Sequence, residues 1–167
     1  SSMDLKLKIF NAGISVVDIN NDNQIDILTI SDQQLLLYEN NKGNFKKHII
    51  IQNINDYITS IIAIDRNFDN EKDLILLGHK GIYEYQKIPK KLALKKTQMT
   101  ELPYAFSICI GDLINDEHLE YFIGRVNNVS FNLAGNNALP NQLLNHHLQP
   151  IPSSFESTKW TLACSIA

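Results

Sequence analysis

One nine-residue pattern constrains the fold of this chain more than any other feature. It places side-chain oxygens at alternate positions of a short segment that lies between two apolar, β-branched stretches. In its first copy, residues 18–26, the oxygens stand at positions 1, 3, 5 and 9. Ca²⁺ takes about six to eight oxygen ligands, one of which a backbone carbonyl at position 7 can supply. The first copy therefore predicts a calcium-binding loop whose ligands are Asp18, Asn20, Asp22, Gln24 and Asp26.

An EF-hand loop begins in the same way, but it requires a glutamate at position 12 and a helix on each side. Position 12 is Thr29 here, and it lies inside the strand-like stretch Ile27 to Ile30. The stretch that precedes the loop, Ile14 to Val17, is also typical of a β-strand. We therefore expect the loop to join two strands of one sheet.

The pattern recurs twice at a constant interval, since 47 residues separate Asp18 from Asp65 and also Asp65 from Asp112. A fixed period of this length is typical of repeat arrays and propeller blades. The second copy keeps all four oxygen positions, whereas the third has Ile114 at position 3 and a glutamate at position 9, which predicts a weaker site. The expected ligands are Asp65, Asn67, Asp69, Glu71 and Asp73 in the second loop, and Asp112, Asp116 and Glu120 in the third.

A strand, the string Asp-x-Asn-x-Asp-x-x-x-Asp and an apolar strand together resemble the FG-GAP or VCBS repeat, the blade unit of integrin-α-like β-propellers. The segment Asn136 to Asn145 is similar to the cartilage acidic protein and ASPIC/UnbV branch. The resemblance implies an all-β fold of about three four-stranded antiparallel blades within a larger propeller of about seven or eight. These families usually carry glycine at loop position 6, where this chain has Asn23, Asn70 and Glu117. Asparagine tolerates the left-handed conformation of such a glycine, which leaves Glu117 as the departure that weakens the third loop.

Strand and turn signals divide the chain, as one β-propeller domain, into blades at about 13–56, 57–104 and 105–159, with 160–167 starting a further blade. A cluster of Asn and Gly at residues 40–44 predicts a hairpin in the first blade. In the third blade we expect a strand at Val129 to Asn132, followed by a long polar connection to Pro152. We expect the chain to be part of a longer propeller, and the alternative is a small propeller closed by oligomerisation.

The composition argues against several classes of partner. A net charge of −3 and a pI near 5.9 lack the basic character of a nucleic-acid-binding protein. No apolar run approaches the roughly 18 residues that span a bilayer, so we expect no membrane insertion. The first residues lack the apolar core of a signal peptide, whereas the resemblance implies an extracellular or cell-surface protein.

Other reactive side chains give no sign of catalysis. Cys109 and Cys164 lie in apolar runs and are interpreted as buried free thiols. His146 and His147 are adjacent, so in a strand their rings would point to opposite faces, and we interpret every histidine as a surface residue. The chain has no nucleophile motif and no phosphate-binding loop.

The sequence therefore favours a non-enzymatic, calcium-stabilised scaffold for binding or adhesion. The resemblance implies that its partners are proteins or glycans. The calcium is expected to be structural. One alternative is a carbohydrate-binding or carbohydrate-active propeller whose site is completed by further blades. Another is an intracellular scaffold whose degenerate loops no longer bind metal.

Overall fold

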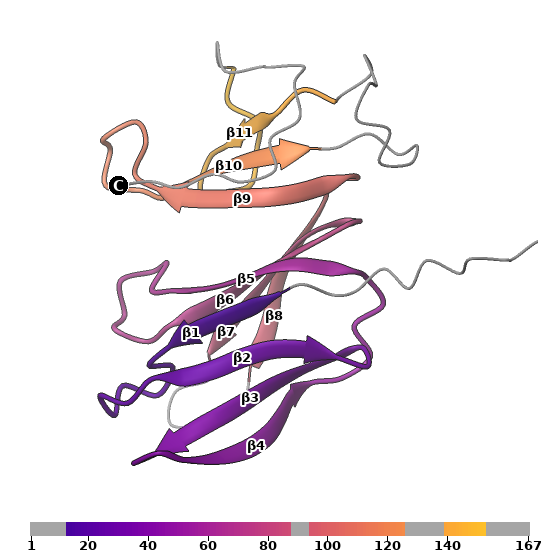
Figure 1. Cartoon of the computed structure of the whole chain (residues 1–167). Helices are drawn as coiled ribbons and strands as arrows, with labels where there is room; N and C mark the ends of the chain where they lie inside the picture. Colours follow the sequence, from indigo (N-terminus) through magenta and orange to yellow (C-terminus); the bar gives the residue numbers. More distant parts are fainter. Residues whose placement is uncertain (1–12, 88–93, 126–138, 153–167) are drawn as a thin grey trace, which may run out of the picture.

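The chain folds into three antiparallel β-sheets that lie one beside the next (Figure 1). The computed structural model describes residues 13–87, 94–125 and 139–152, and none of these residues is helical. The predicted all-β fold is therefore confirmed, and sheets of three and four antiparallel strands have the form of propeller blades. The described part of the chain contains no helix suited to crossing a membrane.

Each sheet is built from strands that are consecutive in the sequence. The first sheet has the order β1 (Ile14–Val17), β2 (Asp26–Ser31), β3 (Gln34–Asn41) and β4 (Asn44–Ile51). The second has the order β5 (Ile58–Ile64), β6 (Asp73–Gly78), β7 (Gly81–Lys87) and β8 (Leu94–Glu101). The third has the order β11 (Gln142–Leu144), β10 (Glu120–Arg125) and β9 (Ala105–Gly111).

Each of the three metal-loop patterns joins the first two strands of its unit, as predicted, and none is flanked by helices. The strands that precede and follow the first loop pair in register, with Val17 opposite Asp26 and Ile14 opposite Thr29. The second and third loops close their strand pairs in the same way, with Ile64 opposite Asp73 and Gly111 opposite Glu120. The EF-hand alternative is thereby excluded.

The hairpin predicted at residues 40–44 is present between β3 and β4. Its two central residues, Lys42 and Gly43, have φ values of 52° and 88°, as a tight two-residue β-hairpin turn requires. The turn between β6 and β7 needs glycine for another reason, because a Cβ atom on Gly81 would lie 2.1 Å from the carbonyl oxygen of Thr100. Strand pairing therefore requires glycine at residue 81.

The third sheet differs from the expectation in its last strand. The polar connection predicted before Pro152 contains β11, whose Leu143 and Leu144 are buried against the rest of the sheet. Three residues are too few to produce a recognisable alternation, which is why the sequence did not reveal this strand. The strand predicted at Val129 to Asn132 lies outside the described residues.

Two apolar cores hold the sheets together, and β6 contributes to both. Leu74 and Leu76 point into the core shared with the first sheet, whereas Ile75 and Leu77 point into the core shared with the third. All four side chains are almost completely buried. Alternate side chains of a strand face opposite sides, so an uninterrupted apolar run is what a strand covered on both faces requires.

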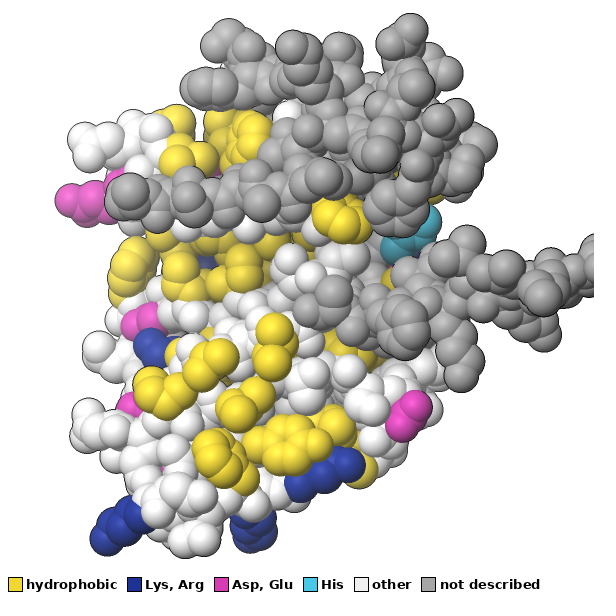
Figure 2. Space-filling model, viewed as in Figure 1, with side chains coloured by type: hydrophobic (Ala, Val, Ile, Leu, Met, Phe, Trp, Pro, Cys, Tyr) yellow, Lys and Arg dark blue, Asp and Glu magenta, His cyan; other side chains and the backbone are white. Residues whose placement is uncertain are grey.

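The first sheet carries a face that the described residues leave exposed. Ile14 and Val16 of β1 are 63% and 64% exposed, and apolar side chains gather over this part of the molecule (Figure 2). One repeat of 47 residues later, Ile61 is buried in the first core, and Ala63 packs against the same core. The same repeat positions are thus covered in the second sheet and uncovered in the first.

The prediction of free thiols is wrong for Cys109, because this residue of β9 is disulfide-bonded. The other cysteine of the chain, Cys164, lies outside the described residues. A disulfide framework is recognised in a sequence from the number and spacing of its cysteines, and two cysteines provide too little of that signal.

The central position of β6 leads to a test of the sheet-to-sheet core. We expect Leu76→Ala to lower the free energy of unfolding by about 2 to 5 kcal/mol, because it leaves a cavity where no solvent reaches. Phe45→Ala is the control, since Phe45 is 51% exposed and its truncation should change stability by less than about 0.5 kcal/mol. Urea denaturation measures both, and equal losses would contradict this placement of the core.

Candidate metal centres

The three loops share one backbone conformation. Positions 4 and 6 of every loop have φ values between 58° and 66°, in the left-handed region that non-glycine residues rarely adopt. Glu117, at position 6 of the third loop, has a φ of 65°, the same as Asn23 in the first. The third loop therefore keeps the shape of the other two despite its unfavourable residue.

Carboxylates fix this conformation by accepting backbone N–H groups. Asp18 at position 1 accepts from the N–H of Asp22 at 3.1 Å and from that of Asn23 at 2.8 Å. Asp65 accepts from the equivalent N–H groups at 3.0 and 2.8 Å, and Asp112 at 3.1 and 3.1 Å. The position 5 carboxylates accept from the N–H of position 7 at 2.8, 2.8 and 3.0 Å along the chain. Side chains expected to bind metal are thus already organised by the loop.

The carboxylate at position 9 is buried in every loop, with exposures of 0% for Asp26, 6% for Asp73 and 0% for Glu120. Asp26 accepts from the N–H of position 2 of its own loop at 3.1 Å and from that of Asn40 on β3 at 2.8 Å. Asp73 accepts from the N–H of Lys87 on β7 at 3.4 Å. Asn40 and Lys87 each lie 14 residues after their carboxylate, and this constant spacing is a signal that the sequence interpretation missed.

Burial raises the pKa of Asp73, and the hydrogen bond from the Lys87 N–H opposes this effect. The carboxylates of Asp69 and Asp65 raise it further. The ionised form of Asp73 is therefore disfavoured by its surroundings, and a nearby cation would favour it.

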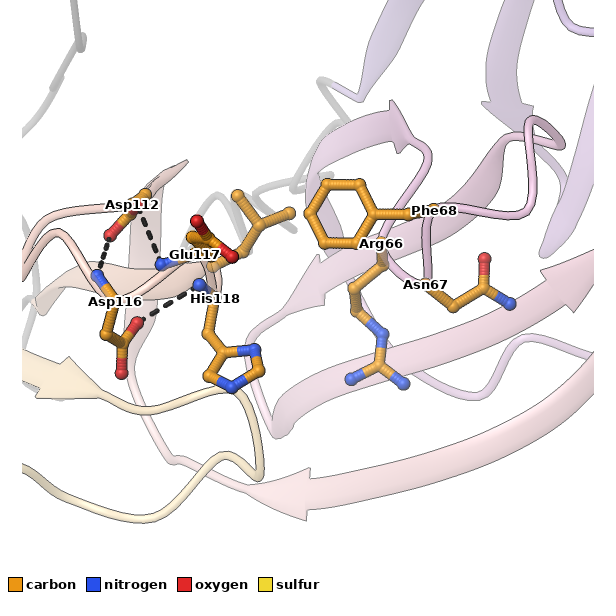
Figure 3. A pocket seen from close by; sticks show the side chains of 8 residues that line it. Arg66, Asn67, Phe68, Asp112, Asp116, Glu117 and His118 are labelled. Atoms are coloured by element: carbon orange, nitrogen blue, oxygen red, sulfur yellow. Dashed lines mark hydrogen bonds between the residues drawn. The ribbon is translucent and has the colours of Figure 1, made fainter.

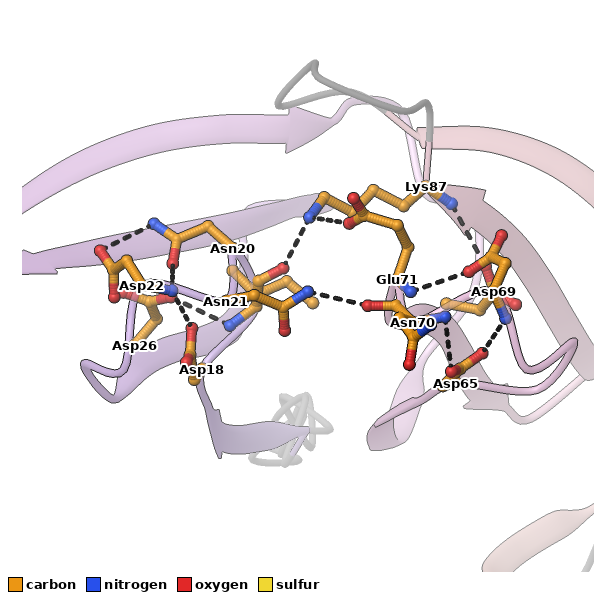
Figure 4. Close-up of polar contacts among 12 residues, drawn as sticks. Asp18, Asn20, Asn21, Asp22, Asp26, Asp65, Asp69, Asn70, Glu71 and Lys87 are labelled. Carbon is orange, nitrogen blue, oxygen red and sulfur yellow. Dashed lines mark hydrogen bonds and ion pairs between the residues drawn. The ribbon is translucent and has the colours of Figure 1, made fainter.

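The side chains of Asp18, Asn20 and Asp22 lie together in the first loop, and those of Asp65 and Asp69 lie together in the second (Figure 4). The amide of Asn20 donates to Asp22 at 3.1 Å, and that of Asn67 donates to Asp69 at 2.9 Å. The position 7 side chains turn to other partners. The Gln24 side chain accepts from the N–H of Lys42, and the Glu71 carboxylate pairs with the Lys87 ammonium. The position 7 side chains of these two loops thus contact groups outside their loops, and the position 7 backbone carbonyls stay candidate metal ligands.

The third loop brings its carboxylates closest together. The ligand oxygens of Asp112, Asp116 and Glu120 lie within 4.8 Å of one another, and no other trio of Asp, Glu, His or Cys side chains in the described residues does so. Glu120 Oε2 accepts from the N–H groups of Leu113 at 2.8 Å and Ile114 at 3.3 Å. Glu120 Oε1 is buried and has no hydrogen-bond partner among the described residues. A glutamate is one methylene longer than an aspartate, which lets this carboxylate extend further into its loop.

Neighbouring loops are in direct contact. The side-chain amide of Asn21 in the first loop donates to the carbonyl of Asn70 in the second at 2.8 Å (Figure 4). The Lys87 ammonium donates to the carbonyl of Ile19 at 3.0 Å and pairs with Glu71 at 2.5 Å. The first two candidate sites are therefore joined by polar contacts.

A buried polar group also joins the second loop to the third sheet. The hydroxyl of Tyr121 on β10 donates to Glu84 on β7 at 2.8 Å, and the Arg66 guanidinium lies 3.4 Å from the same carboxylate oxygen. Burial and the adjacent Glu84 carboxylate raise the pKa of Tyr121, which keeps its hydroxyl protonated as a donor. This contact supports the packing of β7 against β10.

A cleft of about 830 Å³ lies between the second and third loops. Arg66, Asn67 and Phe68 line one side, and Asp112, Asp116 and residues 117–119 line the other (Figure 3). Phe68 is 66% exposed and has a φ of 58°, where the other two loops carry asparagine. A bulky, exposed aromatic residue in a strained conformation is unusual, and such strain is found most often at functional sites.

Comparison with known families identifies the repeat. Residues 18–76 match the family model of the FG-GAP-like repeat, a span that contains the first two loops and the strands between them. No curated protein matches the chain. The predicted likeness to the FG-GAP repeat is therefore confirmed, whereas the finer likenesses to the integrin-like and ASPIC branches stay predictions.

The left-handed conformation of Glu117 provides a test of the shared loop geometry. Glu117→Gly should raise the free energy of unfolding by up to about 1 kcal/mol, because glycine adopts this φ without the steric penalty of a side chain. Glu117→Ala is the matched control, since it removes the carboxylate but keeps the penalty. Chemical denaturation in EDTA measures both variants, and a loss of stability in the glycine variant alone would contradict the loop geometry.

Proposed function

We propose, on the premise that residues 18–76 match the FG-GAP-like repeat, that this chain is a non-enzymatic, calcium-stabilised scaffold for protein or glycan partners. FG-GAP repeats suggest a β-propeller-type scaffold for binding or adhesion, and the family is generally non-enzymatic. The proposal adds calcium at the three loops and a binding role for the rim on which these loops lie.

The observation that carries the calcium proposal is the carboxylate group of Asp112, Asp116 and Glu120. Carboxylates this close repel one another, and the buried Glu120 oxygen without a donor is energetically unfavourable. A divalent cation relieves both penalties. The atoms that would bind the metal are carboxylate oxygens, which suit a hard ion such as Ca²⁺. The weaker site expected from the sequence thus has the strongest support from its geometry.

The first two loops support the same proposal through their shared backbone. Asp18, Asn20 and Asp22 offer side-chain oxygens from one short loop, and the second loop repeats this set with Asp65, Asn67 and Asp69. A carboxylate oxygen that accepts one N–H group retains a lone pair for a cation. We therefore propose one calcium ion in each loop, with the position 7 carbonyl and the position 9 carboxylate completing the set.

The proposed calcium has a structural role. A catalytic metal keeps an open position beside groups that transfer protons. The first two loops contain no histidine, and their side chains form hydrogen bonds within the loop and to the adjacent strands. Such an ion would neutralise the loop carboxylates and stabilise the folded state.

An extracellular location agrees with this role. FG-GAP repeat proteins are typically extracellular or exposed at the surface. Calcium modules outside the cell bind in the range of about 10⁻⁴ to 10⁻³ M, which matches the calcium available there. The disulfide of Cys109 supports the same location, because disulfides persist in oxidising compartments.

One observation favours a glycan partner over a protein partner. The cleft between the second and third loops combines an exposed Phe68 ring with the charged side chains of Arg66 and Asp112. Small-ligand sites commonly join an aromatic surface to a few oriented polar groups. Cleavage with turnover would instead support the carbohydrate-active alternative.

Calcium removal tests the central claim. We expect EDTA to lower the melting temperature, because an ion that binds only the folded state adds about 1 to 3 kcal/mol per site at about ten- to hundredfold excess over Kd. Asp22→Ala, Asp69→Ala and Asp116→Ala should each reduce the calcium-dependent gain in melting temperature. Glu101→Ala, an exposed carboxylate at the end of β8, should leave the gain unchanged.

Comparison of each variant with and without calcium separates ion binding from any direct loss of stability. The calcium proposal fails if no concentration of calcium changes the melting temperature of the unmodified chain. That outcome would favour the intracellular scaffold with degenerate loops.

The variant Phe68→Asn tests the glycan proposal. Asparagine stands at the same position of the other two loops, so the fold should be retained with equal or greater stability. The unmodified chain should bind a subset of glycans on an array in calcium, and the variant should lose most of this signal. Unchanged binding by a folded variant would exclude Phe68 from the binding surface.

A further inference from the structure

Three of the five histidines lie together beside the third loop. The ring centroids of His118 and His146 are 4.3 Å apart, and those of His146 and His147 are 4.0 Å apart. The other two histidines have separate surroundings, since His48 pairs with Glu39 at 2.8 Å and His79 contacts another aromatic ring. The cluster is therefore a local feature of the third sheet.

A turn after β11 brings the adjacent histidines together. Asn145 Oδ1 accepts from the N–H of His147 at 3.0 Å and from that of Gln149 at 2.9 Å. The N–H of Leu148, which has a φ of 59°, donates to the carbonyl of Asn145 at 2.8 Å. The sequence interpretation assumed a strand, in which the two rings would face opposite sides. In the turn the ring of His146 contacts the rings of both His118 and His147.

Two further contacts hold this arrangement in place. The Arg66 guanidinium of the second loop donates to the carbonyl of His146 at 3.1 Å. The N–H of His118 donates to Asp116 at 3.0 Å, and the His118 ring extends toward the segment that follows β11 (Figure 3). The His118 ring thus belongs to the third loop, and the rings of His146 and His147 belong to the turn after β11. Internal hydrogen bonds order both segments.

We propose that His118, His146 and His147 form a binding site for a divalent transition metal ion of the Zn²⁺ type. Imidazole nitrogen is a preferred ligand of Zn²⁺, Cu²⁺ and Ni²⁺, whereas Ca²⁺ selects oxygen. The site uses the His118 side chain of the third loop and no carboxylate, and the proposal does not rest on calcium in that loop.

Metal binding requires the rings to rotate, because the ligand nitrogens of the three histidines do not all lie within 4.8 Å of one another. With Zn–N bonds of about 2.1 Å in a tetrahedral site, the ring centroids of two ligands lie roughly 5 Å apart. The rings must therefore separate from their present stacked contacts and turn one nitrogen each toward a common point. His118 and His147 are exposed and His146 is half-buried, which leaves space for this rotation. Three imidazoles leave one position of a tetrahedral ion for water.

Bound metal would connect the third loop to the turn after β11. These two segments contact each other through the histidine rings, and the ion would replace this weak stacking by coordination bonds. The ion would therefore restrain the outer strand of the third sheet relative to its loop, independently of calcium in that loop.

Isothermal titration calorimetry with ZnCl₂ tests the proposal on the full chain. Calcium is kept at a saturating concentration so that the carboxylate loops are occupied. We expect one Zn²⁺ per chain. We expect His118→Gln, His146→Gln and His147→Gln each to weaken Zn²⁺ binding by at least about tenfold, because mutation of a residue that only hydrogen-bonds to a metal ligand already lowers metal affinity by about 10- to 100-fold.

Two control variants separate this site from other zinc binding. His48→Gln, in the first sheet, and Asp22→Asn, in the first loop, should leave the Zn²⁺ affinity unchanged. Asp22→Asn should still reduce the calcium response, so that failure of the two proposals is distinguishable. Visible absorption of Co²⁺-loaded protein provides a second readout, because nitrogen ligation in a tetrahedral site gives intense bands that the histidine variants should lose.

The melting temperature of each metal-free variant shows that it folds. The proposal is overturned if the folded, unmodified chain binds no Zn²⁺ up to about 1 mM, a concentration well above the Kd of ordinary protein zinc sites. It is also overturned if binding persists unchanged in the three histidine variants, or if Asp22→Asn weakens it as much as they do.

Discussion

Backbone N–H groups bound to carboxylates are the interaction on which the rest of this structure depends. In each repeat, one carboxylate organises the loop and another, at the start of the second strand, is buried where the loop meets the sheet. In the first repeat, the buried carboxylate of Asp26 also accepts a hydrogen bond from the N–H of Asn40 on β3, which is distant from the loop in the sequence. Burial of a charged group is favourable only when it is paired or hydrogen-bonded, so the loop sequence and the sheet constrain each other.

Sheet packing follows from the alternation of side chains along strands that are covered on both faces. The second sheet lies between two others, and its central strand β6 is consequently apolar at successive positions. Between β7 and β10, the hydroxyl of Tyr121 donates to Glu84 and remains protonated because burial and the adjacent carboxylate raise its pKa. Apolar area therefore provides the cohesion between sheets, and polar contacts such as this pair add directional constraints.

The sequence predicted most of what is periodic in this molecule. The oxygen positions, their spacing of 47 residues and the β-branched flanks were sufficient to predict the all-β fold and the strand-to-strand loops, because both depend on local pattern. Features that depend on a few residues or on distant contacts were missed. The three-residue strand β11 has no recognisable period, and the disulfide of Cys109 depends on distant parts of the chain.

The candidate site shows the same division. The sequence predicted which residues offer oxygen ligands, and it predicted a weaker third site because position 3 of that loop is Ile114. It did not predict that the longer Glu120 side chain would bring its carboxylate close to those of Asp112 and Asp116. The histidine cluster was missed for a different reason, since a turn and not a strand holds His146 and His147. Metal binding, the blade boundaries and the length of the complete propeller stay predictions.

The contact between the first two loops has a consequence for how the proposed ions would enter. Asn21 binds the carbonyl of Asn70, and the Lys87 ammonium lies between Ile19 and Glu71. Ordering one loop therefore restricts the other, so the second ion meets a partner that has already lost part of its conformational freedom. Occupancy of this pair would then rise more steeply with calcium than two independent sites allow, and positive cooperativity would give the rim a threshold response.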